Sequence, residues 1–355
     1  MKQVVCSKIG NLRDPDPCKR GRVSTIEVPE PELIDEESVK IQVAYCAICG
    51  SDPNTINGAF GTTVPIGLGH EVSGVIVELG KKATKKGLKV GDRVAGNFVR
   101  PCGTCYYCRN GQEQFCEHAF GNEFNPPGMS EYIVWHESQV FKLPSGMDLK
   151  RGCLLEPVSV VVRMADKTQM KVGDRVAISG GGPIGLLGLQ MMKLYGATSL
   201  TLIEPIAQRR ELGVKFGADY TIDPLQQDVQ QKASQITNGL GFDVIIDVSG
   251  APSAAKVLPQ IAAYGGCIIY GAMYPKNYEM PVNLFNVFYH KELTVTGMYL
   301  SPFAFPRAVQ LMERMQLDDF VTNVFDIEDA SGAFESHISG KHPKTLICCS
   351  RNLTE

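Results

Sequence analysis

Four cysteines lie close together between Cys102 and Cys116, in the segment CGTCYYCRNGQEQFC, with two, two and seven residues between them. Cysteines at this density form disulfides, ligate an iron–sulfur cluster or bind a metal ion. The N-terminus, MKQVVCSKIGN, lacks the charged, apolar and small-residue order of a signal peptide. Since the cytosol keeps thiols reduced, we predict a metal site rather than disulfides. Four thiolates can close a tetrahedron around zinc, and the spacing leaves an iron–sulfur cluster open as the alternative.

A second set of metal-ligating residue types is spread along the chain. Cys49 begins CGSD at 49–52, His70 and Glu71 end GHE at 69–71, and Glu156 precedes a proline. Each residue has an ordinary structural explanation: a buried thiol, a core histidine or an acid at a domain edge. Together they offer one thiolate, one imidazole and one or two carboxylates, which is enough for zinc with an open coordination position.

A glycine-rich loop predicts a dinucleotide site. The apolar run VAIS leads directly into GGGPIG at 180–185, and a helical stretch follows. Gly180 would make the tight turn, Gly182 would let a pyrophosphate approach the backbone, and Gly185 would let the helix pack on the strand. Glu204, at the end of the next strand, would bind both ribose hydroxyls and disfavour a 2′-phosphate, which predicts NAD. Arg209 nearby leaves NADP as the alternative. The other candidate cofactor contacts are Pro183, Ile184, Ser249 and Gly271.

The pattern of apolar residues changes along the chain. Before about residue 158, short alternating strands with Gly and Pro turns predict a mostly β domain. After residue 173, continuous apolar runs alternate with helical stretches, which is typical of βαβ units and a parallel sheet. We therefore expect an α/β protein with a mostly β domain over 1–158, its cysteine lobe at about 97–118, a nucleotide-binding domain over 159–294, and a return to the first domain over 295–355.

Composition limits the possible partners. The 355 residues suffice for about two domains. A formal net charge of -3 without a basic block argues against nucleic acid or an anionic membrane as a partner. The charge-free stretch at 176–192 contains GGG-Pro and is shorter than the roughly 18 to 20 apolar residues of a membrane helix. We expect a cytoplasmic protein without a transmembrane segment.

In combination, these motifs resemble the zinc-dependent medium-chain dehydrogenase/reductase family, and within it the polyol, or sorbitol dehydrogenase-like, branch. The matching segments span nearly the whole chain and are CGSD at 49–52, GHE at 69–71, the four-cysteine lobe, EP at 156–157, GGGPIG at 180–185 and KELTVTG at 291–297. The resemblance implies a GroES-like catalytic domain interrupted by a Rossmann-fold NAD-binding domain, with the active site in the cleft between them. It also implies a homodimer or homotetramer.

The resemblance further implies a role for each metal-site residue. Cys49 and His70 would ligate a catalytic zinc, and Glu71 and Glu156 would compete for the remaining protein position. Asp52 would orient His70 from behind. A structural zinc would be held by Cys102, Cys105, Cys108 and Cys116.

The implied reaction is hydride transfer between NAD(H) and a secondary alcohol of a polyol or sugar, phosphorylated or not. Zinc would activate the substrate hydroxyl as a Lewis acid. Ser51 would accept the hydroxyl proton and pass it on through the cofactor ribose. Glu156 would contribute to the catalytic site in this scheme.

Three positions depart from the family pattern. Asn54 and Arg163 stand where the family commonly has histidine, and Leu300 where polyol enzymes often have arginine. These changes leave open a threonine dehydrogenase-like or simple secondary alcohol dehydrogenase, with a non-catalytic zinc-stabilised binding protein as a remote alternative. The amides of Asn54 and Asn323 favour a substrate with several hydroxyls.

Overall fold

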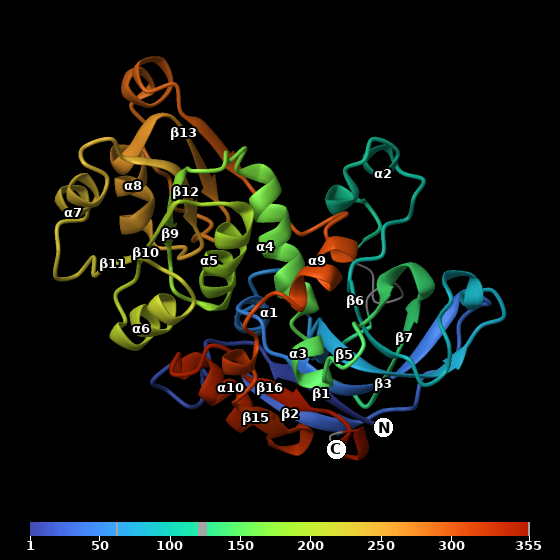
Figure 1. The fold of residues 1–355 in the computed structure, drawn as a ribbon. Coiled ribbons are helices and arrows are strands. Elements are labelled where there is room, and N and C mark those ends of the chain that lie inside the picture. The colour runs from blue at the N-terminus through green and yellow to red at the C-terminus, as the bar shows by residue number, and fades with distance from the viewer. Residues whose placement is uncertain (62, 120–125, 354–355) are drawn as a thin grey trace. The chain divides into compact units, whose positions relative to one another are not determined.

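The computed structural model describes residues 1–61, 63–119 and 126–353 (Figure 1). The chain divides into two compact units, and the first is assembled from both ends of the sequence. It comprises Met1–Glu156 and Phe305–Glu355, and the second comprises Pro157–Ala304. The first bound lies two residues before the predicted boundary at 158, whereas the second lies ten residues after the predicted boundary at 294.

The first unit is built on two β-sheets. The larger has the strand order β15-β16-β3-β5-β6-β8, with β7 paired to β3, and the smaller has the order β2-β1-β4. The strands are β1 (Lys2–Lys8), β2 (Arg22–Glu27), β3 (Ser38–Ala47), β4 (Ile66–Gly67), β5 (Glu71–Leu79), β6 (Arg93–Gly96), β7 (Tyr132–His136), β8 (Val140–Lys142), β15 (Val324–Asp326) and β16 (Leu346–Cys348). The helices are α1 (Ser51–Ile56), α2 (Tyr106–Arg109), α3 (Leu149–Gly152), α9 (Phe305–Met312) and α10 (Ala330–Ser339).

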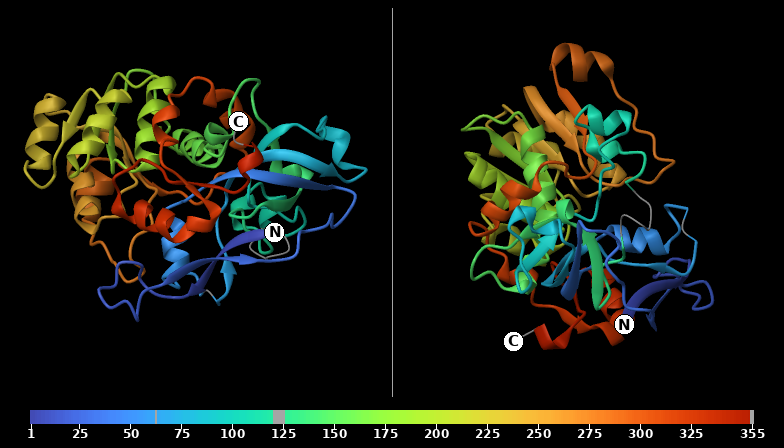
Figure 2. Two further views of the ribbon diagram at one scale, coloured as in Figure 1. Left: turned by 90° about the horizontal axis from the view of Figure 1, so that it is seen from below. Right: turned by 90° about the vertical axis from the view of Figure 1, so that its right-hand side faces the viewer.

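Strand β3 is the centre of this unit. Val39, Ile41 and Val43 alternate along it and are fully buried, as expected for one face of a strand packed on a core. That core also contains Trp135 from β7 and Phe334 from α10. Helix α10 packs against β2, and Figure 2 shows the red C-terminal segment beside the blue N-terminal strands. The last part of the chain therefore completes the domain that the first part begins.

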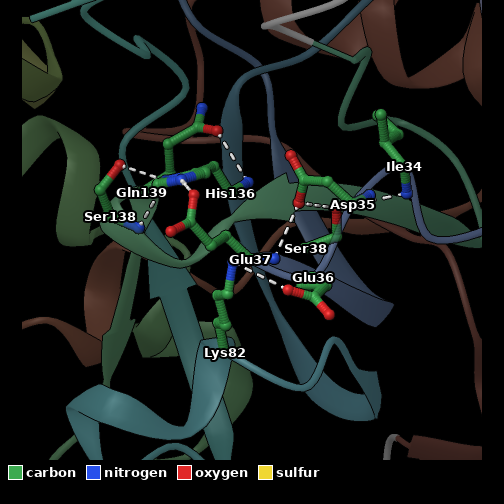
Figure 3. Close-up of polar contacts among 9 residues, drawn as sticks. All are labelled: Ile34, Asp35, Glu36, Glu37, Ser38, Lys82, His136, Ser138 and Gln139. Atoms are coloured by element: carbon green, nitrogen blue, oxygen red, sulfur yellow. Dashed lines mark hydrogen bonds and ion pairs between the residues drawn. The ribbon is translucent and has the colours of Figure 1, made fainter.

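Polar contacts fix the start of β3 against the end of β7 (Figure 3). His136 Nε2 lies 3.1 Å from Glu37 Oε2, and His136 Nδ1 accepts from the backbone N–H of Ser138 at 3.1 Å. By accepting the Ser138 N–H, the imidazole caps the turn that follows β7, and the Gln139 side chain in return accepts the His136 backbone N–H. On the other strand, Ser38 Oγ donates to Asp35 Oδ1 at 2.8 Å. This anchor holds one end of β3, and the opposite end leads to Cys49.

The second unit is a six-stranded sheet with the order β11-β10-β9-β12-β13-β14, parallel in all its pairs. The strands are β9 (Arg175–Ser179), β10 (Ser199–Ile203), β11 (Tyr220–Ile222), β12 (Phe242–Asp247), β13 (Ala262–Tyr270) and β14 (Thr294–Gly297). The helices are α5 (Pro183–Tyr195), α6 (Ala207–Lys215), α7 (Val229–Ile236) and α8 (Pro252–Ile261), and α4 (Leu155–Lys167) runs into this unit from the first. The predicted parallel sheet is confirmed, and β14 continues it past residue 294.

The helices of this unit pack in two pairs. Helix α5 contacts α6, and α7 contacts α8. Because crossovers between parallel strands are right-handed, the reversal of strand order at β9 puts the two pairs on opposite faces of the sheet. The loops after β9 and β12 meet at this reversal, which is where such sheets bind ligands. Among the described residues, no helix combines the length and apolar character that a membrane span requires.

Candidate functional site

Three metal-ligating side chains converge in the first unit. One ligand atom from each of Cys49, His70 and Glu71 lies within 4.8 Å of the others. Strand pairing brings them together, because Ala47 at the end of β3 pairs with Glu71 at the start of β5. Gly69 makes the turn before His70 with φ of 90°, and a Cβ there would lie 2.4 Å from Met129 Cγ. The sequence therefore needs glycine at this position to present the imidazole.

Asp52, on the first turn of α1, supports two of these residues from behind. Its Oδ2 accepts the Cys49 backbone N–H at 2.8 Å, and its Oδ1 lies 3.8 Å from His70 Nδ1. Burial raises the pKa of the Asp52 carboxyl, and His70 partly offsets that rise. Burial alone would lower the pKa of His70, but Cys49, Asp52 and Glu156 raise it well above its usual value. Acidic side chains and a thiol therefore surround the imidazole. Its Nδ1 faces Asp52, and its Nε2 is the nitrogen that does not.

Glu71 has its two carboxylate oxygens in different environments. Oε1 accepts from Lys344 Nζ at 2.5 Å, whereas Oε2 is buried and has no hydrogen-bond partner in the part of the chain that the structure describes. An unpaired buried carboxylate oxygen is costly unless a cation or donor meets it. A metal ion bound by Cys49 and His70 would meet that need, so the residues present fit a zinc site.

Glu156 lies close to this group but outside the three residues that share the 4.8 Å distance. It stands in the first turn of α4, is buried, and interacts electrostatically with His70 and Glu71. Burial raises the pKa of Glu156 to about 7; His70 opposes this and Glu71 adds to it. Of the two carboxylates that the sequence left in competition, Glu71 has the geometry of a direct ligand.

Ser51 and Asn54 both belong to α1, the helix that begins just after Cys49. Among the described residues, the Ser51 hydroxyl has no hydrogen-bond partner, while its backbone carbonyl accepts from Thr55. The Asn54 amide donates to the Gly50 carbonyl at 3.4 Å. Ser51 therefore keeps its hydroxyl available for another molecule.

The cysteine lobe forms a second metal-binding group. The sulfurs of Cys102, Cys105, Cys108 and Cys116 all lie within 4.8 Å of one another. Zn–S bonds of about 2.3 Å place tetrahedral sulfurs about 3.8 Å apart, and Cys102 Sγ lies 4.0 Å from Cys108 Sγ. Hydrogen bonds from Thr104 and Cys105 lower the pKa of Cys102 to about 5, which favours the thiolate. Four sulfur ligands with no position left open fit a structural zinc.

The glycine loop of the second unit borders a cavity of about 510 Å³. Its lining includes the predicted cofactor contacts Gly180, Gly182, Glu204, Arg209 and Ser249. Gly180 has φ of 105°, and a Cβ on Gly185 would lie 1.8 Å from the Gly180 carbonyl oxygen. Only glycine fits at these two positions. Pro183, Ile184 and Gly185 form the first turn of α5, and Gly271 follows β13 outside the lining of this cavity.

Glu204 is tied to the loop itself. Its Oε2 accepts the Gly181 backbone N–H at 2.6 Å and its Oε1 accepts that of Ile206 at 2.9 Å. The residue is buried at the end of β10, so its carboxylate is held at one edge of the cavity. Each oxygen keeps a second lone pair for a ligand hydroxyl. Glu204 therefore both braces the loop and offers acceptors beside it.

The structure gives two residues contacts that the sequence does not predict. Lys344 meets Glu71, 273 positions away, and nothing near Lys344 in the sequence indicates this contact. The sequence predicts that Asn323 binds substrate. Its amide nitrogen instead donates to Ser336 Oγ and Thr345 Oγ1, both at 2.9 Å, so it joins α10 to the chain before β16.

Comparison with known proteins finds a matching family for each unit. Residues 35–145 match the family described as alcohol dehydrogenase GroES-like domain, and residues 183–314 match the family described as zinc-binding dehydrogenase. A sorbitol dehydrogenase from Halalkalibacterium halodurans is 32% identical and the match covers 92% of this chain and 96% of that protein. A D-arabitol-phosphate dehydrogenase from Enterococcus avium is 32% identical over 92% of this chain and 94% of its own. The crystal structure of a putative zinc-binding dehydrogenase from Clostridium scindens superposes with a TM-score of 0.90 at 32% identity, covering 98% of this chain and 99% of that one.

Proposed function

Because this chain belongs to the zinc-dependent medium-chain alcohol dehydrogenase family, we propose that it transfers a hydride between NAD(H) and a secondary alcohol of a polyol or sugar. The observation that carries the proposal is the convergence of Cys49, His70 and Glu71 with one buried, unpaired carboxylate oxygen. A thiolate, an imidazole and a carboxylate leave one coordination position for a substrate oxygen. The names of the two curated relatives support a polyhydroxylated substrate, phosphorylated or not.

The protein's own residues orient the metal ligands and carry the substrate proton away from this site. Zinc, when bound, supplies Lewis-acid chemistry that makes the substrate hydroxyl easier to deprotonate. Ser51 Oγ, which has no hydrogen-bond partner among the described residues, would accept the hydroxyl proton while its own proton passes on to water. Asp52 holds the backbone of Cys49 by a hydrogen bond and attracts the His70 ring electrostatically across 3.8 Å, which favours the orientation of both ligands.

In the second unit the glycine loop holds the cofactor pyrophosphate at the N-terminus of α5, where the helix dipole favours negative charge. Glu204 accepts ribose hydroxyls with the lone pairs that its backbone contacts leave unused. A 2′-phosphate beside this fixed carboxylate would meet charge repulsion, so NAD is the preferred cofactor. NADP is the competing candidate because Arg209 lines the same cavity.

A substrate panel read by NADH absorbance tests the proposal. It compares polyols, polyol phosphates, sugars, threonine and simple secondary alcohols, each with NAD and with NADP. We expect kcat/KM to be highest for a polyol or its phosphate with NAD. Faster turnover of simple alcohols or threonine than of every polyhydroxylated compound would reject the substrate class, and a higher kcat/KM with NADP would reject the cofactor.

We also propose that the protein is a homo-oligomer, with a dimer or tetramer as the expected forms. Among the described strands, β14 pairs only with β13, which leaves one edge of the second unit's sheet open. Leu284, Phe285 and Tyr289, shortly before this strand, are each at least 60% exposed. An uncharged strand edge beside exposed apolar residues is a typical association surface. Light scattering of the purified protein measures the subunit number, and the cytoplasmic location stays a prediction.

A further inference from the structure

Lys344 is a buried lysine, which is rare unless the charge is paired. It stands just before β16, and its side chain is 2% exposed. Nζ donates to Glu71 Oε1 at 2.5 Å and to the Ile48 carbonyl oxygen at 3.1 Å. Ile48 immediately precedes Cys49, so the ammonium group bridges two segments that carry candidate metal ligands.

This contact divides the Glu71 carboxylate between two tasks. Lys344 holds Oε1, and the buried Oε2 has no partner among the described residues. The same carboxylate contributes an oxygen to the 4.8 Å group with Cys49 and His70. A lysine that holds one oxygen therefore restricts the rotation of the carboxylate and leaves the other oxygen for an ion.

The charge of Lys344 matters as much as its hydrogen bonds. Four groups around the centre can be anionic: the Cys49 thiolate and the carboxylates of Asp52, Glu71 and Glu156. A divalent ion offsets two of these charges, and the remaining excess would stay buried without compensation, which is strongly unfavourable. Among the electrostatic partners of Lys344 are Glu71, Cys49 and Glu156. Its ammonium group supplies the third positive charge.

We propose that Lys344 is a positioning residue of the metal centre, which aims Glu71 at the metal ion and lets several anionic donors gather around it. The inference rests on the proposed zinc-dependent function and deepens it. Residues that orient metal ligands from behind typically contribute about 10- to 100-fold to metal affinity. We therefore expect Lys344 to govern the affinity of this centre, and to leave the cysteine lobe unaffected.

The test measures zinc affinity by competition with a chromophoric chelator, and ligand geometry by the absorption spectrum of the cobalt-substituted protein. Lys344→Met should weaken zinc binding at this centre by about 10- to 100-fold and shift the cobalt spectrum. Lys344→Arg should restore much of the affinity, since it keeps the charge. Lys142→Met is the matched control, because Lys142 forms an ion pair with Asp92 at 2.7 Å on the surface, and it should change neither readout.

Two further variants keep the proposal testable if Lys344→Met fails to fold. Lys344→Gln retains a hydrogen-bond donor without the charge and should also weaken zinc binding. In a Glu71→Gln background, replacing Lys344 should no longer weaken it, because the carboxylate that the lysine positions is gone. Unchanged affinity in Lys344→Gln or Lys344→Met, or an equal loss in the Glu71→Gln background, would overturn the inference. If the parent protein binds no zinc that Cys49→Ser removes, the proposed function itself fails.

Discussion

The two metal-binding groups of the first unit are assembled in opposite ways. The lobe takes four cysteines from one short segment, and neighbouring backbone amides donate to their sulfurs. The other group, Cys49, His70 and Glu71, depends on the pairing of β3 with β5. Its buried partner Lys344 comes from a third segment, 273 positions from Glu71. The lobe is therefore formed by residues close together in sequence, whereas the metal centre forms only when the sheet has formed.

Because the two sites are built differently, we expect loss of each metal to have a different consequence. A metal ion with all four coordination positions filled by sulfur cannot bind a substrate oxygen, so the metal of the lobe contributes stability. A centre with three protein ligands leaves one position open, so its metal contributes chemistry. The sheet around it is held by its own apolar core. We therefore expect loss of the lobe metal to lower stability and loss of the metal at Cys49, His70 and Glu71 to lower turnover.

The largest effect on turnover is expected for His70→Ala. The imidazole is one of the three side chains that would ligate the metal, and Lewis-acid activation is worth several kcal/mol. The kcat/KM should fall by at least about 10³-fold, while the melting temperature stays close to that of the parent. Steady-state kinetics and thermal unfolding check both halves, and near-normal activity would remove His70 from the centre.

A smaller loss of turnover is expected for Ser51→Ala. General acid–base groups contribute about 10²- to 10⁴-fold, so kcat should drop within that range while zinc content stays unchanged. Asn54→Ala, on the same helix, should affect kcat much less, because an amide cannot titrate. A larger rise in KM than fall in kcat would indicate that Asn54 binds a substrate hydroxyl. A silent Ser51→Ala would exclude the proton route.

The smallest effect on turnover is expected for Cys105→Ser. Loss of the lobe metal should lower the melting temperature by several degrees, because metal-binding free energy is part of the stability of such sites. The kcat of the protein that remains folded should stay within about threefold of the parent. Calorimetry and activity at low temperature separate the two effects. An unchanged melting temperature, or loss of turnover in fully folded protein, would contradict the assignment of a purely structural role to the lobe metal.

The same contrast explains what could be predicted from the sequence. Lobe spacing is a local property, so Cys102, Cys105, Cys108 and Cys116 could be grouped before the fold was known. The glycine loop is also local, since Gly180 and Gly185 occupy positions that exclude any side chain. Both sites can be recognised from short segments, although Glu204 from the next strand also braces the glycine loop.

Contacts made by strand pairing could not be predicted in this way. Lys344 meets Glu71 because β16 and β5 both flank β3, and no local pattern marks that lysine. The sequence predicts that Asn323, like Asn54, binds substrate with its amide, but the Asn323 side chain donates to Ser336 and Thr345. The choice between Glu71 and Glu156 likewise depended on which carboxylate oxygen the fold leaves without a partner.

The most direct test of the account is the zinc content of purified protein, measured by mass spectrometry for the parent and for Cys49→Ser. The parent should contain about two zinc ions per chain, one in the lobe and one at the centre. Cys49→Ser should contain about one, retain the parent melting temperature and form no NADH with any alcohol in the panel. A Cys49→Ser protein that kept both the parent's zinc content and its turnover would contradict the assignment of the catalytic metal to Cys49, His70 and Glu71.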